Sequence, residues 1–225
     1  MKRNHFSLLV FVLLLLFILN SHAQTQDANL WMNVAIEKKI TPKFSIGISQ
    51  EFRMNENITE LGTFFTDLCF NYKITKNIRV SANYRIINKR RLDDSYSLRH
   101  RYYFDLSFRK KYRPVIFNFR TRFQSQYKDV LSSNDGKVPS NTLRNKLTIK
   151  FDAGKKLQPY ISAEIYTPLH RPFDIFIDNT RYSAGVEYEI NRMHTIDVFY
   201  LFQKEYNINK PQIDHVLGIG YFISL

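Results

Sequence analysis

The sequence predicts an all-β protein, a transmembrane antiparallel up-and-down β-barrel of about 10–12 strands. Three observations predict this fold class. Apolar and polar residues alternate along most of residues 24–225 with the period of two that belongs to a β-strand. The alternating segments run to about 10 or 11 residues, the length that crosses a bilayer when strands are tilted. The connections between the segments are alternately short and long, as in outer-membrane barrels.

An N-terminal leader precedes these segments. Lys2 and Arg3 begin it, residues 6–19 form an apolar core, and Ser21-His22-Ala23 provides a cleavage site with small residues at its first and last positions. We therefore expect residues 1–23 to be a signal peptide that is cleaved after Ala23. An uncleaved anchor is the alternative, but the apolar core is shorter than the roughly 20 residues that span a membrane as a helix.

The composition fits one exported β-domain over residues 24–225. The chain has 15% aromatic residues but only 7 Gly and 7 Pro, which suits long strands with few breaks. Its formal net charge is +13, or +11 once Lys2 and Arg3 leave with the leader. An exported chain rarely meets nucleic acid, so we expect no nucleic-acid partner and assign the charge to anionic lipid headgroups or a charged lumen. The one cysteine, Cys69, excludes a disulfide scaffold.

The first five segments show the alternation clearly. The first covers about residues 28–38, and the fifth is the most regular because Arg99, Arg101 and Asp105 alternate with apolar residues. The apolar positions of the second to fifth segments are, in order, Phe44, Ile46, Ile48 and Phe52; Phe64, Leu68, Phe70 and Tyr72; Ile78, Val80, Ala82, Tyr84 and Ile86; Leu98, Tyr102, Phe104, Leu106 and Phe108.

Six further segments continue the pattern to the end of the chain. Their apolar positions are, in order, Val115, Phe117, Phe119 and Phe123; Leu143, Leu147, Ile149 and Phe151; Ile161, Ala163 and Ile165; Tyr182, Ala184, Val186, Tyr188 and Ile190; Ile196, Val198, Tyr200 and Phe202; Leu217, Ile219, Tyr221 and Ile223. Single-chain bacterial barrels have an even number of strands. Eleven strands would bring the first and last together in parallel; otherwise residues 24–30 add a short strand or plug, or one segment is split or missed.

The apolar faces of the second to eleventh segments carry no Asp, Glu, Lys or Arg. Their polar exceptions are Gln50, Thr66, His100, Thr121 and Asn145. A charge on a lipid-facing strand costs about 2–4 kcal/mol at the bilayer midplane, which accounts for this exclusion. A soluble barrel or sandwich also alternates, with its apolar face inside. Aromatic residues near both ends of the apolar faces favour a membrane barrel with interfacial girdles.

The connections after odd-numbered segments are short, and two of them almost repeat. Residues 39–43 read K-I-T-P-K and residues 73–77 read K-I-T-K-N. Most connections after even-numbered segments are longer. Short periplasmic turns and long extracellular loops are typical of outer-membrane barrels, so we expect the short basic turns to face the periplasm.

The charged face then lines the interior, and its charges separate into two arcs. The basic arc lies on the fourth to seventh segments and comprises Arg79, Arg85, Arg99, Arg101, Arg120, Arg122, Arg144 and Lys146, with Lys150 beside them. The acidic arc lies on the second, third, eighth, ninth and tenth segments and comprises Glu51, Asp67, Glu164, Glu187, Glu189 and Asp197. Because buried charges must be paired, we predict salt bridges across the lumen.

Two interpretations of these arcs stay open. In one, the charges fill and solvate the interior and carry no function, because a barrel of this size is closed or narrow once long side chains occupy it. In the other, the basic arc forms an anion-preferring pore or a small-molecule pocket.

Signatures of catalysis and of metal or cofactor binding are missing from the sequence. It has no Gly-rich phosphate loop, G-x-S-x-G, H-E-x-x-H or cysteine pair. His100 is the outward histidine within a strand, and its neighbours Leu98 and Tyr102 offer no nucleophile. His170, His194 and His215 lack metal-ligand spacing. We therefore assign no catalytic or metal residues and expect no cofactor and no enzyme activity.

Several stretches are similar to a family of exported proteins from Gram-negative bacteria that carries a "domain of unknown function" label. They are F-F-T-D-L, I-I-N-K-R-R, R-H-R-Y-Y-F-D-L-S-F, Y-K-D-V followed by S-S-N-D-G-K, L-R-N-K-L and P-Y-I-S-A-E-I-Y, and the likeness covers about residues 28–225. The resemblance implies an outer-membrane barrel and brings no catalytic residues. The last segment also resembles the signal that barrel-assembly machinery reads, although it ends on Leu225 where Phe is commonest.

The sequence as a whole predicts an integral outer-membrane protein of a Gram-negative bacterium, either structural or a narrow or occluded pore with a charge-paired lumen. Its expected partners are outer-membrane lipids, lipopolysaccharide and the barrel-assembly machinery; its oligomeric state is left open. A lipid-modifying outer-membrane enzyme and a soluble periplasmic ligand-binding barrel are the alternatives.

Overall fold

The computed structural model describes residues 25–128, 138–152, 156–169, 177–207 and 211–225. These residues form strands and connections. The strands are β1 (Thr25–Lys39), β2 (Phe44–Asn55), β3 (Glu60–Lys73), β4 (Ile78–Arg90), β5 (Tyr96–Tyr112), β6 (Val115–Lys128), β7 (Ser140–Phe151), β8 (Leu157–Pro168), β9 (Asn179–Glu189), β10 (His194–Glu205) and β11 (Gln212–Ser224). No helix long and apolar enough to cross a bilayer occurs in the described ranges.

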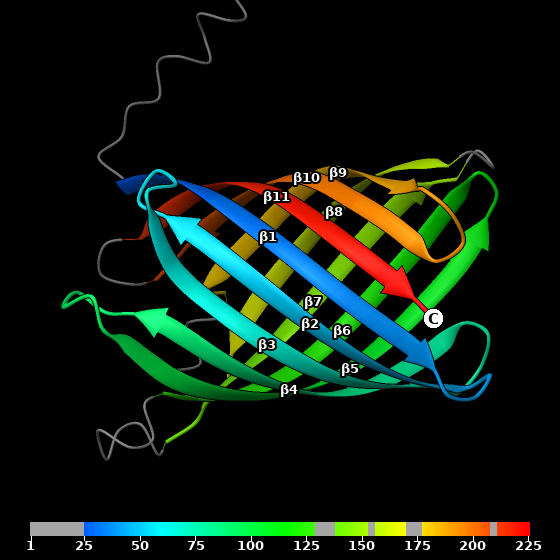
Figure 1. The fold of residues 1–225 in the computed structure, drawn as a ribbon, viewed down its shortest axis with the longest axis horizontal. Coiled ribbons are helices and arrows are strands. Elements are labelled where there is room, and N and C mark those ends of the chain that lie inside the picture. Colours follow the sequence, from blue (N-terminus) through cyan, green and yellow to red (C-terminus); the bar gives the residue numbers. More distant parts are fainter. Residues whose placement is uncertain (1–24, 129–137, 153–155, 170–176, 208–210) are drawn as a thin grey trace, which may run out of the picture.

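The strands close into one barrel in which each strand pairs with its neighbours in sequence, and β1 pairs with β11 (Figure 1). Ten of the eleven pairings are antiparallel, whereas β1 and β11 are parallel, with Leu30 opposite Leu217 and Val34 opposite Tyr221. The predicted all-β barrel of 10–12 strands is confirmed. The first and last strands meet in parallel, as the sequence predicts for eleven strands, because an odd number of up-and-down strands leaves both running in the same direction.

The apolar faces of the strands point outward and the charged faces point into the barrel. Phe104 and Ile161 are 58% and 59% exposed, whereas Asp67 and Arg144 are 6% and 7% exposed. A soluble barrel needs the reverse arrangement, with its apolar side chains packed inside. Large exposed apolar side chains lie on every strand, so the exterior is an almost continuous apolar surface.

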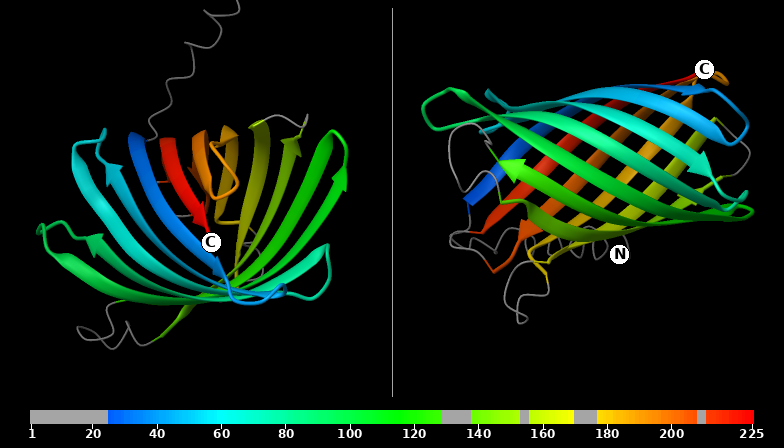
Figure 2. Two further views of the ribbon diagram at one scale, coloured as in Figure 1. Left: turned by 45° about the vertical axis from the view of Figure 1, so that its right-hand side comes forward. Right: turned by 90° about the horizontal axis from the view of Figure 1, so that it is seen from below.

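The connections separate into two rims, which Figure 2 shows from two further directions. The short-turn rim holds the connections after β1, β3, β5, β7 and β9, and the chain also ends there, where Leu225 N donates to Glu37 O at 2.8 Å. The long-loop rim holds the connections after the even-numbered strands and the beginning of β1. The connections after β6, β8 and β10 are the longest, as the sequence predicts, whereas those after β2 (residues 56–59) and β4 (residues 91–95) are about as short as the turns of the other rim.

The two near-repeat turns adopt the same hydrogen-bonded conformation. Thr41 Oγ1 accepts a hydrogen bond from Phe44 N at 2.9 Å, and Thr75 Oγ1 accepts one from Ile78 N at 3.0 Å. Threonine closes such turns because its hydroxyl lies within reach of backbone groups two or three residues further on. The shared K-I-T sequence therefore marks a shared turn geometry.

The polar residues on the apolar faces are paired with one another across neighbouring strands. Thr66 Oγ1 donates to Gln50 Oε1 at 2.5 Å, and Thr121 Oγ1 donates to Asn145 Oδ1 at 2.9 Å. The fifth exception, His100, shares a 2.7 Å hydrogen bond with the hydroxyl of Tyr84. An unpaired polar group in an apolar environment costs free energy, and these pairings avoid that cost.

Some expectations fall outside the described residues. These are the signal peptide over residues 1–23 and His170.

Candidate functional site

The inward faces form buried guanidinium–carboxylate pairs. Arg85 donates from Nε to Asp67 Oδ1 at 2.8 Å and from Nη2 to Oδ2 at 2.5 Å. Arg122 makes the same two-pronged contact with Asp105, at 2.6 and 2.7 Å. Such bidentate pairs are geometrically specific and stronger than neutral hydrogen bonds. The prediction that the lumenal charges are paired holds for these residues.

Among the described residues, the ion pairs join nearby strands, and the predicted pairing across the lumen is not found. Asp67 and Arg85 are direct partners in the β3–β4 register, and Asp105 and Arg122 are direct partners in β5–β6. The longest-range pairs skip one strand: Arg120 on β6 reaches Glu164 on β8 at 2.5 Å, and Lys150 on β7 reaches Glu187 on β9 at 2.5 Å. Register places opposite charges side by side along the wall, so the two arcs do not need to meet across the axis.

Glu164 joins two basic residues of the interior. Its Oε1 accepts from Arg120 Nη2 at 2.5 Å and from Arg144 Nε at 3.1 Å, and its Oε2 accepts from Arg144 Nη2 at 2.9 Å. Arg144 is 7% exposed and Glu164 is 5% exposed. This carboxylate is the most heavily shared acid of the described interior.

Arginine and aromatic side chains alternate around the lumen in what we call the Arg–aromatic belt. It comprises Arg122, Tyr103, Arg85, Phe65, Arg53, Trp31, Arg181, Tyr166 and Arg144. Each guanidinium lies over one or two rings: Arg53 Cζ is 3.7 Å from the Trp31 ring centroid and Arg85 Cζ is 3.7 Å from that of Phe65. Arg122 and Arg144 are register partners, which closes the circuit between β6 and β7.

Two rings of the belt are almost completely buried inside the barrel. Phe65 and Tyr103 are 2% and 4% exposed although their strands face the lumen. Strands β10 and β11 lie between Trp31 and Arg181. There the ring of Phe199 on β10 packs against Gly218 on β11, so closely that a Cβ on Gly218 would lie 2.0 Å from the ring. Two cavities lie at opposite rims, one around Arg79 and Lys146 and the other around Arg90 and Arg99, and they share no lining residue. No member of the belt lines either cavity.

Other members of the two arcs have local partners. Glu51 accepts from Arg53 at 2.6 Å, Asp197 accepts from Tyr160 at 3.1 Å, and Glu189 accepts from Gln158 at 2.8 Å. On the basic side, Arg101 donates to Gln126 and Arg99 donates to Ser97 at 3.0 Å. Neither of these two arginines contacts a carboxylate within the described chain.

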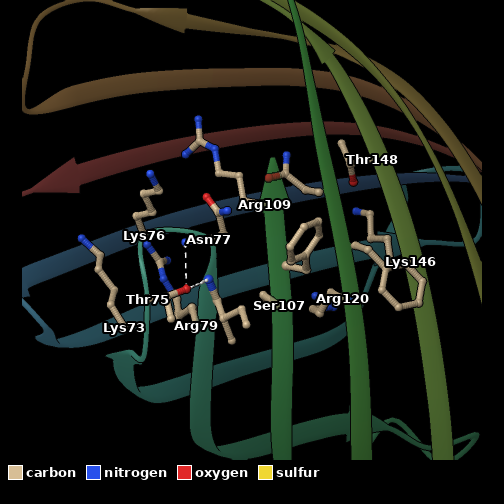
Figure 3. A pocket seen from close by; sticks show the side chains of 14 residues that line it. Lys73, Thr75, Lys76, Asn77, Arg79, Ser107, Arg109, Arg120, Lys146 and Thr148 are labelled. Carbon is tan, nitrogen blue, oxygen red and sulfur yellow. Dashed lines mark hydrogen bonds between the residues drawn. The ribbon is translucent and has the colours of Figure 1, made fainter. Parts of the chain in front are cut away.

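The remaining basic residues gather in a cavity at the short-turn rim, shown in Figure 3. This basic cup has a volume of about 670 Å³ and is lined by six cationic side chains: Lys73, Lys76, Arg79, Arg109, Arg120 and Lys146. They come from five strands, β3 to β7, and the turn after β3. Three belong to the predicted basic arc, whereas Lys73, Lys76 and Arg109 join it through the tertiary structure.

Three histidines of the described residues, His100, His194 and His215, each share a hydrogen bond with a tyrosine. Tyr200 and His215 share a 2.6 Å hydrogen bond, and Tyr221 and His194 share one of 2.7 Å, in the same manner as Tyr84 and His100. No group of three potential metal ligands occurs in the described ranges.

Sequence reasoning missed the aromatic members of the belt. Trp31, Phe65, Tyr103 and Tyr166 lie at positions of the polar face, where the alternation leads one to expect polar residues. The sequence did contain a signal for them, because each is an aromatic residue at a polar-face position of a strand whose polar face, or that of its neighbour, carries arginines. Lys76 was missed for a different reason. It lies in a turn, where the strand alternation does not indicate whether a side chain points into the barrel or away from it.

An apolar exterior, a charged interior and closure without sheet edges define a barrel of the outer-membrane type. Residues 28–214 match the family described as "Protein of unknown function (DUF2490)", and the chain belongs to this family, which confirms the resemblance seen in the sequence. Among solved structures, the chain is similar to the β domain of the Bordetella autotransporter Brka, with a TM-score of 0.49 and 12% sequence identity over 83% of this chain and 86% of that chain. A search of curated proteins gives no significant match.

Proposed function

We propose that this protein is an integral outer-membrane β-barrel of a Gram-negative bacterium with an occluded lumen, and that its short-turn rim faces the periplasm. The observation that carries the proposal is the division of its side chains. Exposed Phe, Tyr, Leu and Ile cover the exterior, and ion-paired Arg, Asp and Glu are buried inside. In water, this exterior would expose an apolar surface far larger than a soluble monomer carries.

The closed sheet satisfies the second requirement of a bilayer. Lipid offers no hydrogen bonds to a backbone, so a spanning sheet needs every strand edge paired, and closure of β1 on β11 meets this need. The leader over residues 1–23 supports export, and the loop asymmetry supports the orientation. Outer-membrane lipids, lipopolysaccharide and the barrel-assembly machinery are the partners that this location implies.

The Arg–aromatic belt supports an occluded lumen rather than an open pore. Barrels of about eight strands are just filled by side chains, whereas those of sixteen or more hold an aqueous channel. With eleven strands, the long side chains of the belt supply the missing volume. A structural or ligand-binding role follows more directly from this interior than solute diffusion does.

Two measurements test the location and the occlusion. Cell fractionation should place the protein in the outer membrane, with the heat-modifiable migration of a folded barrel; release by osmotic shock would contradict the proposal. In planar bilayers, the refolded wild type should conduct little. The Phe65→Ala/Tyr103→Ala variant should conduct several-fold more, because it removes two belt rings.

A matched control keeps the conductance test interpretable. Phe104→Ala removes a ring of the same kind from the outer face of β5, where Phe104 is 58% exposed. This variant should conduct like the wild type. Large conductance by the wild type itself would overturn the occluded lumen without affecting the membrane location.

A further inference from the structure

We propose that the basic cup binds a small, soluble polyanion that carries phosphate or carboxylate groups. The cup is a lumenal cavity whose lining includes six cationic side chains and no carboxylate. Its existence depends only on the barrel interior. Its exposure to the periplasm rests on the proposed function.

Most cations of the cup lack an ion pair, in contrast to the paired arginines of the Arg–aromatic belt. Arg85, Arg122 and Arg144 are each held by a carboxylate at 2.5–2.9 Å. In the cup, only Arg120 makes an ion pair; the side chains of the other five cations make no ion pair or hydrogen bond with the described residues. Like charges so placed repel one another, and the repulsion is relieved when an anion enters.

Arg120 offers an unused donor beside the cup. Its Nη2 donates to Glu164, but its Nε is buried without any hydrogen-bond acceptor. A buried donor that lacks a partner is costly, and a ligand oxygen within reach would satisfy it. Glu164 also accepts a hydrogen bond from Arg144 of the belt, so this shared carboxylate fixes the position of Arg120 relative to the belt.

Size and neutral groups define the kind of ligand. A cavity of about 670 Å³ falls within the roughly 300–1,000 Å³ range of small-molecule sites. Ser107, Asn118 and Thr148 line it together with the cations and offer hydrogen bonds to uncharged parts of a ligand. Several cations around one cavity suit a ligand with two or more negative charges better than a single carboxylate.

The geometry favours a soluble anion over a lipid headgroup. Arg79, Arg120 and Lys146 project from the inner wall of the barrel, as Figure 3 shows for β4, β6 and β7. A phospholipid in the surrounding bilayer would have to pass its headgroup around the rim while its acyl chains stayed outside the wall. A free phosphate compound reaches the same groups through the mouth of the cup.

Calorimetric titration of the refolded barrel in zwitterionic nanodiscs with pyrophosphate tests the proposal. We expect saturable binding of one pyrophosphate per barrel that weakens as ionic strength rises. The Arg79→Gln/Lys146→Gln variant should bind at least tenfold more weakly. Because both side chains lack an ion pair, this variant should fold, and its heat-modifiable migration verifies that it does.

The matched control removes one Arg and one Lys from the lumenal face at the other rim. Lys89→Gln/Arg99→Gln should bind pyrophosphate within twofold of the wild type, because neither residue lines the cup. Absence of binding by the wild type at low ionic strength, or equal losses in the two variants, would overturn the proposal.

A lipid arm identifies the source of the anion. Nanodiscs that contain phosphatidylglycerol should bind pyrophosphate about as well as zwitterionic ones. The contrary result is a pyrophosphate affinity of the wild type that is tenfold weaker in phosphatidylglycerol nanodiscs than in zwitterionic ones, with no such difference between the two membranes for the Arg79→Gln/Lys146→Gln variant. That result would show that headgroups occupy the cup, and would contradict a soluble ligand. These outcomes are independent of conductance, so failure of the binding site and failure of the occluded lumen can be told apart.

Discussion

Glu164 shows how much one side chain can organise inside this barrel. It accepts hydrogen bonds from Arg120 and Arg144, which lie on two different strands, and it is 5% exposed. Breaking a buried ion pair by removing one partner is strongly destabilising, since the remaining charge stays buried without compensation. The stability of the β6–β8 wall therefore depends on this carboxylate.

Glu164→Gln should lower the free energy of unfolding by about 3–5 kcal/mol. The substitution keeps the shape of the side chain but leaves two guanidinium groups without their counter-charge. Urea unfolding can be followed by the fluorescence of Trp31, the one tryptophan of the chain, which lies in the belt. Glu189→Gln is the control, because Glu189 is exposed and contacts Gln158; a loss of equal size there would refute the special role of Glu164.

At the scale of the element, each strand combines an apolar and a polar face. Strand β5 is the clearest case, with Tyr102, Phe104 and Leu106 between 48% and 58% exposed on one face and Tyr103 buried on the other. The polar groups that do occur outside, such as Thr121 and Asn145, satisfy each other across the β6–β7 register. A strand of this kind is stable only where its outer face meets hydrocarbon.

A charge placed along β5 should measure this environment. Phe104→Arg, at the centre of the strand, should cost about 2–4 kcal/mol in a bilayer, whereas Tyr112→Arg, at its end, should cost about 0–1 kcal/mol. The measurement is reversible unfolding from lipid vesicles. Equal costs at the two positions would mean that the outer face of β5 does not cross a hydrocarbon layer.

At the scale of the whole molecule, the parallel β1–β11 seam decides the closure. Thirteen successive residue pairs join the two strands, from Thr25 with Gln212 to Glu37 with Ser224. An even-stranded barrel would separate β1 from β11 or pair them in the opposite direction. A parallel contact between β1 and β11 therefore distinguishes an eleven-stranded barrel from an even-stranded one.

A disulfide across the seam should form when Met32→Cys is combined with Ile219→Cys in a Cys69→Ser background. These two positions are direct register partners on the outer face, within the separation that a disulfide bridges. Oxidised protein should show altered migration on a denaturing gel. Met32→Cys with Tyr221→Cys, displaced by two residues, should crosslink much less; the reverse preference would exclude this register.

The sequence by itself determined the fold class, a strand count of about ten to twelve and the face that each strand turns outward. These properties are local: a side-chain period of two and the exclusion of charge from one face can be read within ten residues, as in Leu98 to Phe108. The tertiary structure alone decided which charges meet. Asp67 belongs to the acidic arc in the sequence, but register sets it beside Arg85, and closure gathers Lys73, Arg109 and Lys146 from three separate strands into one cup. Register, tilt and closure depend on all strands together, so no single segment encodes them.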